Sequence, residues 1–76
     1  MEKQCLIKLI KDLSGEEIID NFDIFKKKYI YEKDCIIEEV YEYDRMIFNE
    51  KIKYEELQES YLIFLFDKVF KYIRGI

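Results

Sequence analysis

The sequence contains no histidine, proline or tryptophan, and only two glycines and two cysteines. Without histidine, the chain cannot form a Ser-His-Asp triad, a Cys-His dyad or the usual zinc and di-iron sites. Two glycines are too few for a glycine-rich loop that binds phosphate groups. These absences exclude most catalytic motifs, and we expect no enzyme activity, no metal and no cofactor.

Long hydrophobic runs are also missing. No uncharged apolar stretch reaches the about 18 residues that a membrane-spanning helix requires. The first residues, Met1–Cys5, lack the basic start and the apolar run of a signal peptide. We therefore expect a cytoplasmic protein that does not contact a membrane. Cys5 and Cys35 are expected to be reduced, partly buried residues rather than a disulfide.

The chain is rich in both apolar and charged residues, which make up 50% and 39% of its 76 residues. A chain of this length forms one domain, here residues 1–76, and buries about 60% of the surface of the unfolded chain. Isoleucine, lysine, glutamate, tyrosine and phenylalanine dominate. This bias is typical of AT-rich coding DNA, as in low-GC bacteria and their phages.

The order of the charges favours an all-α fold. Ser14–Glu17 has the spacing of a capping box, in which the Ser14 hydroxyl and the Glu17 side chain cap a helix start. Acidic residues then precede basic residues in each following segment, which suits the helix dipole. The pattern predicts a small bundle of three to four helices, at 2–13, 15–30, 34–52 and 54–74.

Two alternatives remain open for the middle of the chain. Residues 35–52 are rich in Ile, Val and Tyr, which favour strands, so a hairpin that turns at Tyr43–Arg45 would give an α+β fold. Helices over 34–52 and 54–74 could also fuse into one rod that dimerises. We favour separate helices because alternate positions are not cleanly apolar and no Asn-Gly turn occurs.

The last predicted helix is apolar around most of its circumference, since its polar residues occupy a wedge of about 60°. We expect it to be the most buried helix of the bundle. Ile63, Phe66 and Phe70 lie on the flank that a single small core needs least. They are predicted to mediate self-association, which would make the protein a homodimer.

Negative charge is concentrated in residues 34–59, which carry nine acidic and three basic residues. On a helix, Glu38, Glu39 and Glu42 would share the side opposite the apolar stripe. Such a surface suits a protein partner with a basic surface. The predicted contact residues are Glu38, Glu39, Glu42, Tyr43, Glu55 and Glu59.

Nucleic-acid binding is not expected. A basic recognition helix is required for a helix-turn-helix, whereas residues 15–25 contain four acidic residues and no basic residue. We predict a small acidic helical protein that inhibits or regulates a macromolecular partner, such as an immunity protein, an antitoxin or a phage-encoded inhibitor. The alternative is a homo-oligomeric structural or adaptor protein that associates through its C-terminal helix.

Overall fold

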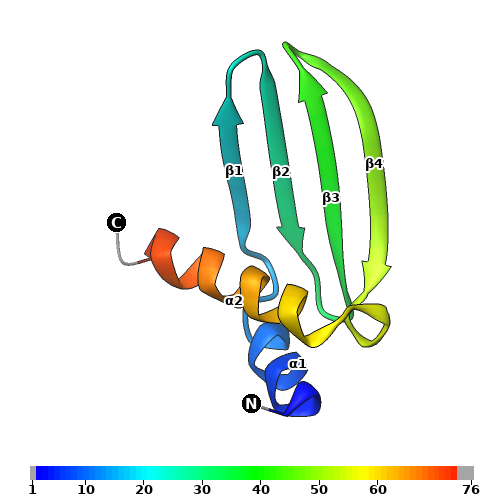
Figure 1. The fold of residues 1–76 in the computed structure, drawn as a ribbon, viewed down its shortest axis with the longest axis vertical. Coiled ribbons are helices and arrows are strands. Elements are labelled where there is room, and N and C mark those ends of the chain that lie inside the picture. The colour runs from blue at the N-terminus through cyan, green and yellow to red at the C-terminus, as the bar shows by residue number, and fades with distance from the viewer. Residues whose placement is uncertain (1, 74–76) are drawn as a thin grey trace.

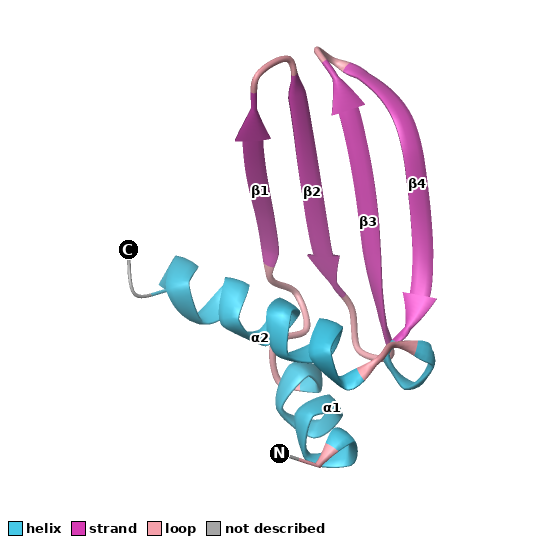
Figure 2. Cartoon of the chain, in the orientation of Figure 1, coloured by secondary structure: helices cyan, strands magenta, loops and turns pink. Residues whose placement is uncertain are grey.

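A helix, four strands and a second helix follow one another in the computed structural model, which describes residues 2–73. Their bounds are α1 (Lys3–Lys11), β1 (Glu17–Phe22), β2 (Phe25–Tyr31), β3 (Cys35–Glu42), β4 (Arg45–Lys53) and α2 (Glu59–Ile73). The strands form one antiparallel sheet in the order β1-β2-β3-β4 (Figures 1 and 2). A short 3₁₀ turn, Tyr54–Glu56, connects β4 to α2.

The all-α prediction is therefore wrong, and the fold is α+β. The predicted helices over 2–13 and 54–74 correspond to α1 and α2, although residue 74 lies outside the described residues. The segments 15–30 and 34–52 instead form two β-hairpins. The second hairpin is the alternative that the Ile, Val and Tyr content favoured. The fused rod is also wrong, because β4 ends six residues before α2 begins.

The Ser14–Glu17 segment does not cap a helix. Gly15 has a φ of +97°, a conformation that favours glycine, and the chain turns there from α1 into the sheet. The Gly15 N–H donates to the Tyr31 carbonyl at 2.8 Å, and the Tyr31 N–H donates to the Glu16 carbonyl at 2.9 Å. These bonds pair the segment with β2, so a local signal for helix capping yields to strand pairing.

Both hairpins end in two-residue turns, Asp23–Ile24 and Tyr43–Asp44. The first residue of each turn has a positive φ, 57° for Asp23 and 55° for Tyr43. Glycine or asparagine usually occupies such a position, so the sequence carries no standard turn signal here. The Tyr43 N–H donates to the Ile24 carbonyl at 2.9 Å, which joins the two turns. We call this end of the sheet distal and the helical end proximal.

The register of the strands places alternate residues on two faces. Face A, which α2 covers in part, has a proximal half that holds Ile18, Tyr29, Tyr31, Ile36 and Ile52. Its distal half holds the pairs Phe22–Phe25 and Val40–Phe48. The opposite surface is face B. A β-bulge near Ile47 returns Arg45 to face A, where it is the cross-strand register partner of Glu42.

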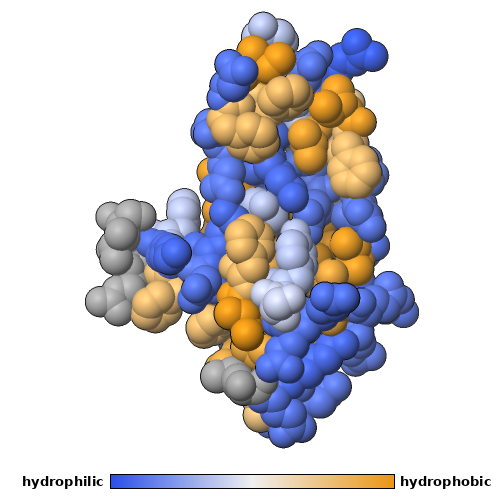
Figure 3. All heavy atoms as spheres, in the orientation of Figure 1, coloured by the Kyte–Doolittle hydropathy of each residue, from blue (hydrophilic) through white to orange (hydrophobic). Residues whose placement is uncertain are grey.

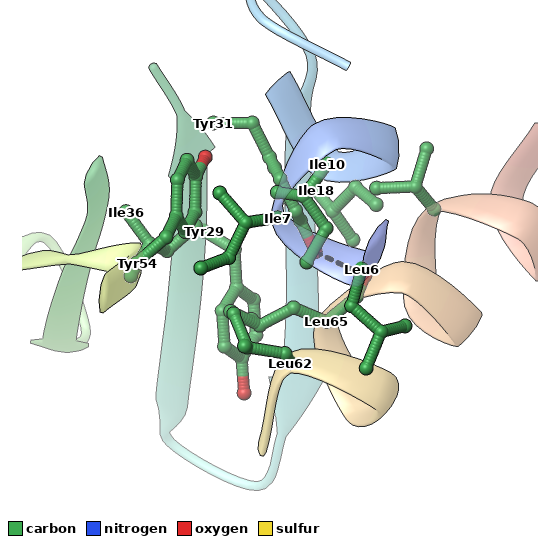
Figure 4. Close-up of a cluster of buried hydrophobic side chains, with 11 residues drawn as sticks. Leu6, Ile7, Ile10, Ile18, Tyr29, Tyr31, Ile36, Tyr54, Leu62 and Leu65 are labelled. Carbon is green, nitrogen blue, oxygen red and sulfur yellow. Dashed lines mark hydrogen bonds between the residues drawn. The ribbon is translucent and has the colours of Figure 1, made fainter. Parts of the chain in front are cut away.

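The core lies between α1, α2 and the proximal half of face A. It consists of Leu6, Ile7, Ile10, Ile18, Tyr29, Tyr31, Ile36, Tyr54, Leu62, Leu65 and Val69 (Figure 4). The two most deeply buried tyrosines satisfy their hydroxyls: Tyr31 donates to the Leu65 carbonyl at 2.7 Å and Tyr54 to the Glu32 carbonyl at 2.8 Å. The first bond fastens the sheet to α2, and the second joins the 3₁₀ turn to the turn after β2.

The prediction of a central C-terminal helix is also corrected. Leu62, Leu65 and Val69 are buried, but α2 lies across the proximal end of the sheet rather than inside a bundle (Figure 1). Its other sides leave Ile63 and Phe70 exposed. Among the described residues, neither helix combines the length and the apolar character needed to cross a membrane.

Candidate functional site

A layer of polar side chains separates the core from the distal half of face A. Glu38 on β3 is only 7% exposed, and it accepts a hydrogen bond from the Tyr61 hydroxyl of α2. Lys27 of β2 forms an ion pair with the other carboxylate oxygen of Glu38 at 3.0 Å. Burial alone would lower the pKa of Lys27, but the hydrogen bond and the charge of Glu38 outweigh it and raise this pKa. The buried carboxylate is thereby paired.

A second ion pair joins α2 to β1 in the same layer. Lys68 of α2 contacts the carboxylate of Asp20, and its ammonium lies 5.0 Å from the ring centre of Tyr29. We call Asp20, Lys27, Glu38, Tyr61 and Lys68 the polar belt. No buried side-chain N or O atom among the described residues lacks a hydrogen-bond partner. The belt therefore closes the core without help from the distal residues.

Beside the belt and toward the hairpin turns, face A carries large apolar side chains that neither helix among the described residues covers. We call Phe22, Phe25, Val40 and Phe48 the distal surface. Phe22 is 53% exposed and Phe48 is 50% exposed. The rings of Phe22 and Phe25 lie 5.9 Å apart, and Val40 and Phe48 are cross-strand partners. Figure 3 shows apolar side chains over the distal ends of the strands on the side where α2 lies.

Four acidic residues flank the distal surface, namely Asp23, Glu42, Asp44 and Glu50. Within residues 2–73, their carboxylates form no hydrogen bond and no ion pair. We call these residues the acidic rim. Arg45 is the basic residue beside them, at the register position opposite Glu42. An apolar floor with four acidic residues and one arginine around it is net negative, and it is suited to a ligand that is both apolar and basic.

Face B differs, because most charged side chains of β1, β2 and β3 on this face are already paired. Lys28 lies 2.8 Å from Glu17, and the Tyr41 hydroxyl donates to Glu39 at 2.8 Å. This hydrogen bond raises the pKa of Tyr41. Lys26 lies 4.8 Å from the ring centre of Tyr41. Such a mixed, internally paired surface is typical of the solvent-exposed side of an antiparallel sheet.

The predicted acidic contact residues do not share one surface. Glu38 is buried in the polar belt, and Glu39 points to face B because adjacent strand residues alternate. Glu42 and Tyr43 lie together at the distal end. Glu55 lies in the 3₁₀ turn, and Glu59 is the first residue of α2. The helical face that was expected to gather them is absent, since this segment forms a hairpin.

The residues predicted for self-association are only partly available on α2. Ile63 is 43% exposed and Phe70 is 48% exposed, whereas Phe66 packs against the core. The rings of Phe66 and Phe70 stack with centres 6.5 Å apart. A small apolar area therefore remains on this helix.

The distal surface itself was missed by the sequence analysis. Its members come from all four strands, and they become neighbours only through pairing of the hairpins. The apolar residues at Val40 and Phe48 follow the two-residue period of their strands. Along β3, Glu38 and Glu42 lie on the same face as Val40, so the apolar residues do not alternate strictly with polar ones.

A hollow of about 790 Å³ lies at the proximal end of face B and is lined by Cys35, Lys51 and Lys53 among others. The Cys35 thiol donates to Glu32 across 3.7 Å, and burial raises the pKa of this thiol. It is therefore the neutral thiol rather than the reactive thiolate at neutral pH. Cys5 is exposed, which corrects the expectation of partial burial, and no metal-binding group of His, Cys, Asp or Glu occurs among the described residues.

The distal surface is the candidate site because it combines exposed aromatic residues with unpaired acidic residues. No protein-family model, no curated protein and no solved structure matches this chain.

Proposed function

We propose that the protein is a small protein-binding module that inhibits or regulates a macromolecular partner, as immunity proteins, antitoxins and phage-encoded inhibitors do. The partner binds at the distal surface and presents basic residues. The observation that carries the proposal is the exposure of Phe22 and Phe48 beside carboxylates that have no partner within the described residues.

The physical basis is burial of aromatic side chains combined with charge steering. Complete burial of a phenylalanine contributes about 1.5–3 kcal/mol, and Phe22 and Phe48 are each half-exposed. Aromatic anchors of this type dominate the binding energy of many interfaces. The net charge of −4 and the acidic rim would accelerate the approach of a basic partner. The proposal is binding without catalysis, in the cytoplasm.

A site-specific cross-linking experiment tests the proposal. A photoreactive amino acid replaces Phe48 on face A or Met46 on face B, two positions of the same strand that are 50% and 41% exposed. In cells of the organism that encodes the protein, we expect the probe at position 48 to trap a discrete partner and the probe at 46 to trap none. Equal capture at both positions, or at neither, contradicts the proposal.

The purified partner then allows a test of charge. Reversal of rim charges in a Glu42→Lys, Glu50→Lys variant should slow association by about tenfold or more at low salt. Glu55→Lys with Glu56→Lys, which also reverses two charges but in the 3₁₀ turn, should have little effect. A partner that binds the rim variant at the unchanged rate does not use the acidic rim.

Self-association through α2 is the second candidate function, which the exposure of Ile63 and Phe70 favours. Sedimentation over a range of concentrations tests it. A dimer that Ile63→Glu dissociates supports it, whereas a monomer at high concentration excludes it.

A further inference from the structure

We propose that the ligand of the distal surface is a basic amphipathic helix, which lies beside α2 across the strands of face A. This inference rests on the proposed function and specifies the chemistry of the partner. It follows from the space on face A, from the nature of the surface and from its charge.

The open half of face A has room for one helix. Neighbouring residues on one face of a strand are about 6.7 Å apart, so over β3 and β4 the open surface from the level of Val40 and Phe48 to the turn spans about 13 Å. Over β1 and β2 the same level holds Asp20 and Lys27 of the polar belt, and the open surface there begins at Phe22 and Phe25. An α-helix with its side chains has a diameter of about 10–12 Å. α2 already covers the proximal half in this way, with Tyr61 and Lys68 at the border. A guest helix would therefore extend an existing layer.

Other types of ligand fit this surface less well. A second sheet packed face to face would collide with α2, which stands above the proximal half of the same face (Figure 1). An added strand would pair with a sheet edge rather than bind over a face. The outer edge at β4 contains a bulge and carries Lys51 and Lys53, features that discourage strand addition.

The width of the sheet sets the number of anchors. Four strands spaced about 4.8 Å apart place β1 and β4 about 14 Å from each other, a distance that a helix covers in about ten residues. Apolar side chains at positions i, i+3 or i+4, and i+7 of the guest would reach Phe22, Phe25 and the Val40–Phe48 pair in turn.

Charge determines the flanks of the guest helix. On the α2 side, Asp20 binds Lys68 and Glu38 binds Lys27. Glu50, the register partner of Glu38, has no charged partner on this side within residues 2–73. On the turn side, Asp23, Glu42 and Asp44 have no charged partner within residues 2–73. Lysine or arginine is therefore required mainly on the flank that faces the hairpin turns.

The probe is a synthetic peptide of about 18 residues, with leucines at helical spacing and lysines at the remaining positions. Fluorescence anisotropy measures its affinity for the full chain, and circular dichroism measures the helix that it gains on binding. A peptide of identical composition without the apolar stripe, and a peptide with glutamate in place of lysine, serve as controls. We expect the first peptide to bind about tenfold or more tightly than either control.

Matched protein variants locate the binding. Phe22→Ser with Phe48→Ser should weaken binding of the helical peptide by about tenfold or more. Ile19→Ser with Met46→Ser, which removes exposed apolar side chains of the same strands from face B, should leave the affinity unchanged. Circular dichroism of the free variants establishes that each remains folded.

Three outcomes overturn the inference. The first is equal binding of the helical and stripeless peptides, which indicates attraction by charge alone. The second is an equal loss in both pairs of variants. The third is a dimer of the chain that only the Phe22 and Phe48 variant dissociates, since a second copy then occupies the surface. If the peptide fails but the probe at position 48 traps a partner in cells, the proposed function stands and the ligand is not such a helix.

Discussion

The proximal and distal halves of face A are built from the same four strands, yet they differ in every property that bears on stability and binding. In the proximal half, Tyr29 and Ile36 are at most 4% exposed and contact the helices. In the distal half, Phe22 and Phe48 are at least 50% exposed. The cause is the extent of α2, which crosses the proximal end of the strands alone (Figure 1).

The apolar residues of the strands therefore have two different roles, which depend on whether the helices cover them. Apolar residues in the proximal half stabilise the fold, because the helices remove them from water. Apolar residues of similar size in the distal half contribute little to the fold and remain available for a partner. The polar belt marks the border, since its charges are paired with one another and require no ligand.

Alkaline pH should have the largest effect on the stability of the fold, because it ionises tyrosines that are buried at the proximal end. Burial raises the pKa of the Tyr31 and Tyr54 hydroxyls above the ordinary value of 10. The folded state favours the neutral hydroxyls, so this stabilisation is complete below pH 10 and is lost as the pH rises above it. Two such groups would cost about 3 kcal/mol per pH unit. We expect cooperative unfolding, followed by circular dichroism together with tyrosinate absorbance.

The exposed turn residue provides the control for this titration. Tyr43 is 71% exposed, so Tyr43→Phe should leave the alkaline transition where it is. If the protein stays folded while Tyr31 and Tyr54 ionise, burial of these two hydroxyls does not stabilise the fold, and the prediction is wrong.

A substitution that creates a cavity in the proximal half should have the next largest effect on stability. Leu65 is fully buried and lies against the Tyr31 hydroxyl, so Leu65→Ala should lower the free energy of unfolding by about 2–5 kcal/mol. Urea denaturation measures this change. Leu9→Ala, at an exposed position of α1, should cost well under 1 kcal/mol. Equal costs at the two positions would remove the distinction between covered and open apolar residues.

Substitution in the polar belt should have an intermediate effect on the free energy of unfolding. Tyr61→Phe removes the hydroxyl that donates to the buried Glu38 carboxylate, and we expect a loss of about 1–3 kcal/mol. Tyr41→Phe removes a similar hydrogen bond to Glu39 on the accessible face B and should cost less than about 0.5 kcal/mol. Thermal unfolding of the two variants side by side tests whether the belt seals the core.

The backbone at the two ends of the sheet allows a finer comparison. At the proximal junction, Gly15→Ala should cost about 1 kcal/mol through its φ of +97° alone, since no heavy atom lies within 4 Å of the added Cβ. At the distal turn, Tyr43→Gly should raise stability by about 0.5 kcal/mol, because Tyr43 has a φ of 55°. Urea midpoints report both changes, and opposite signs to those expected would contradict the backbone argument.

The distal surface should show the smallest effect on stability. Phe22→Ser with Phe48→Ser should change the free energy of unfolding by less than about 1 kcal/mol, because both rings are half-exposed. Urea denaturation measures the change, and the same variant should lose partner binding. A large loss of stability would place these residues in the core and remove the basis for the proposed site.

The two helices were predictable because their apolar residues recur at helical spacing, as Leu6 and Ile10 do in α1. The hairpin of β3 and β4 was not, because Glu38 and Glu42 share face A with the apolar residues of β3 and break the alternation expected of a strand. Only partners far away in the sequence explain Glu38: Lys27 and Tyr61 make its burial possible. The turns added a second obstacle, since Asp23 and Tyr43 adopt positive φ angles without glycine.

By itself, the sequence determined the acidic charge, the absence of histidine chemistry, the two helical segments and an apolar content sufficient for one core. Tertiary structure alone decided which glutamates are buried and which aromatic residues remain open to a partner. The physical reason is that helix periodicity is a local property, whereas the exposure of a strand residue depends on whether a distant element covers it. Here α2 ends the core at the polar belt, and the strands continue beyond it.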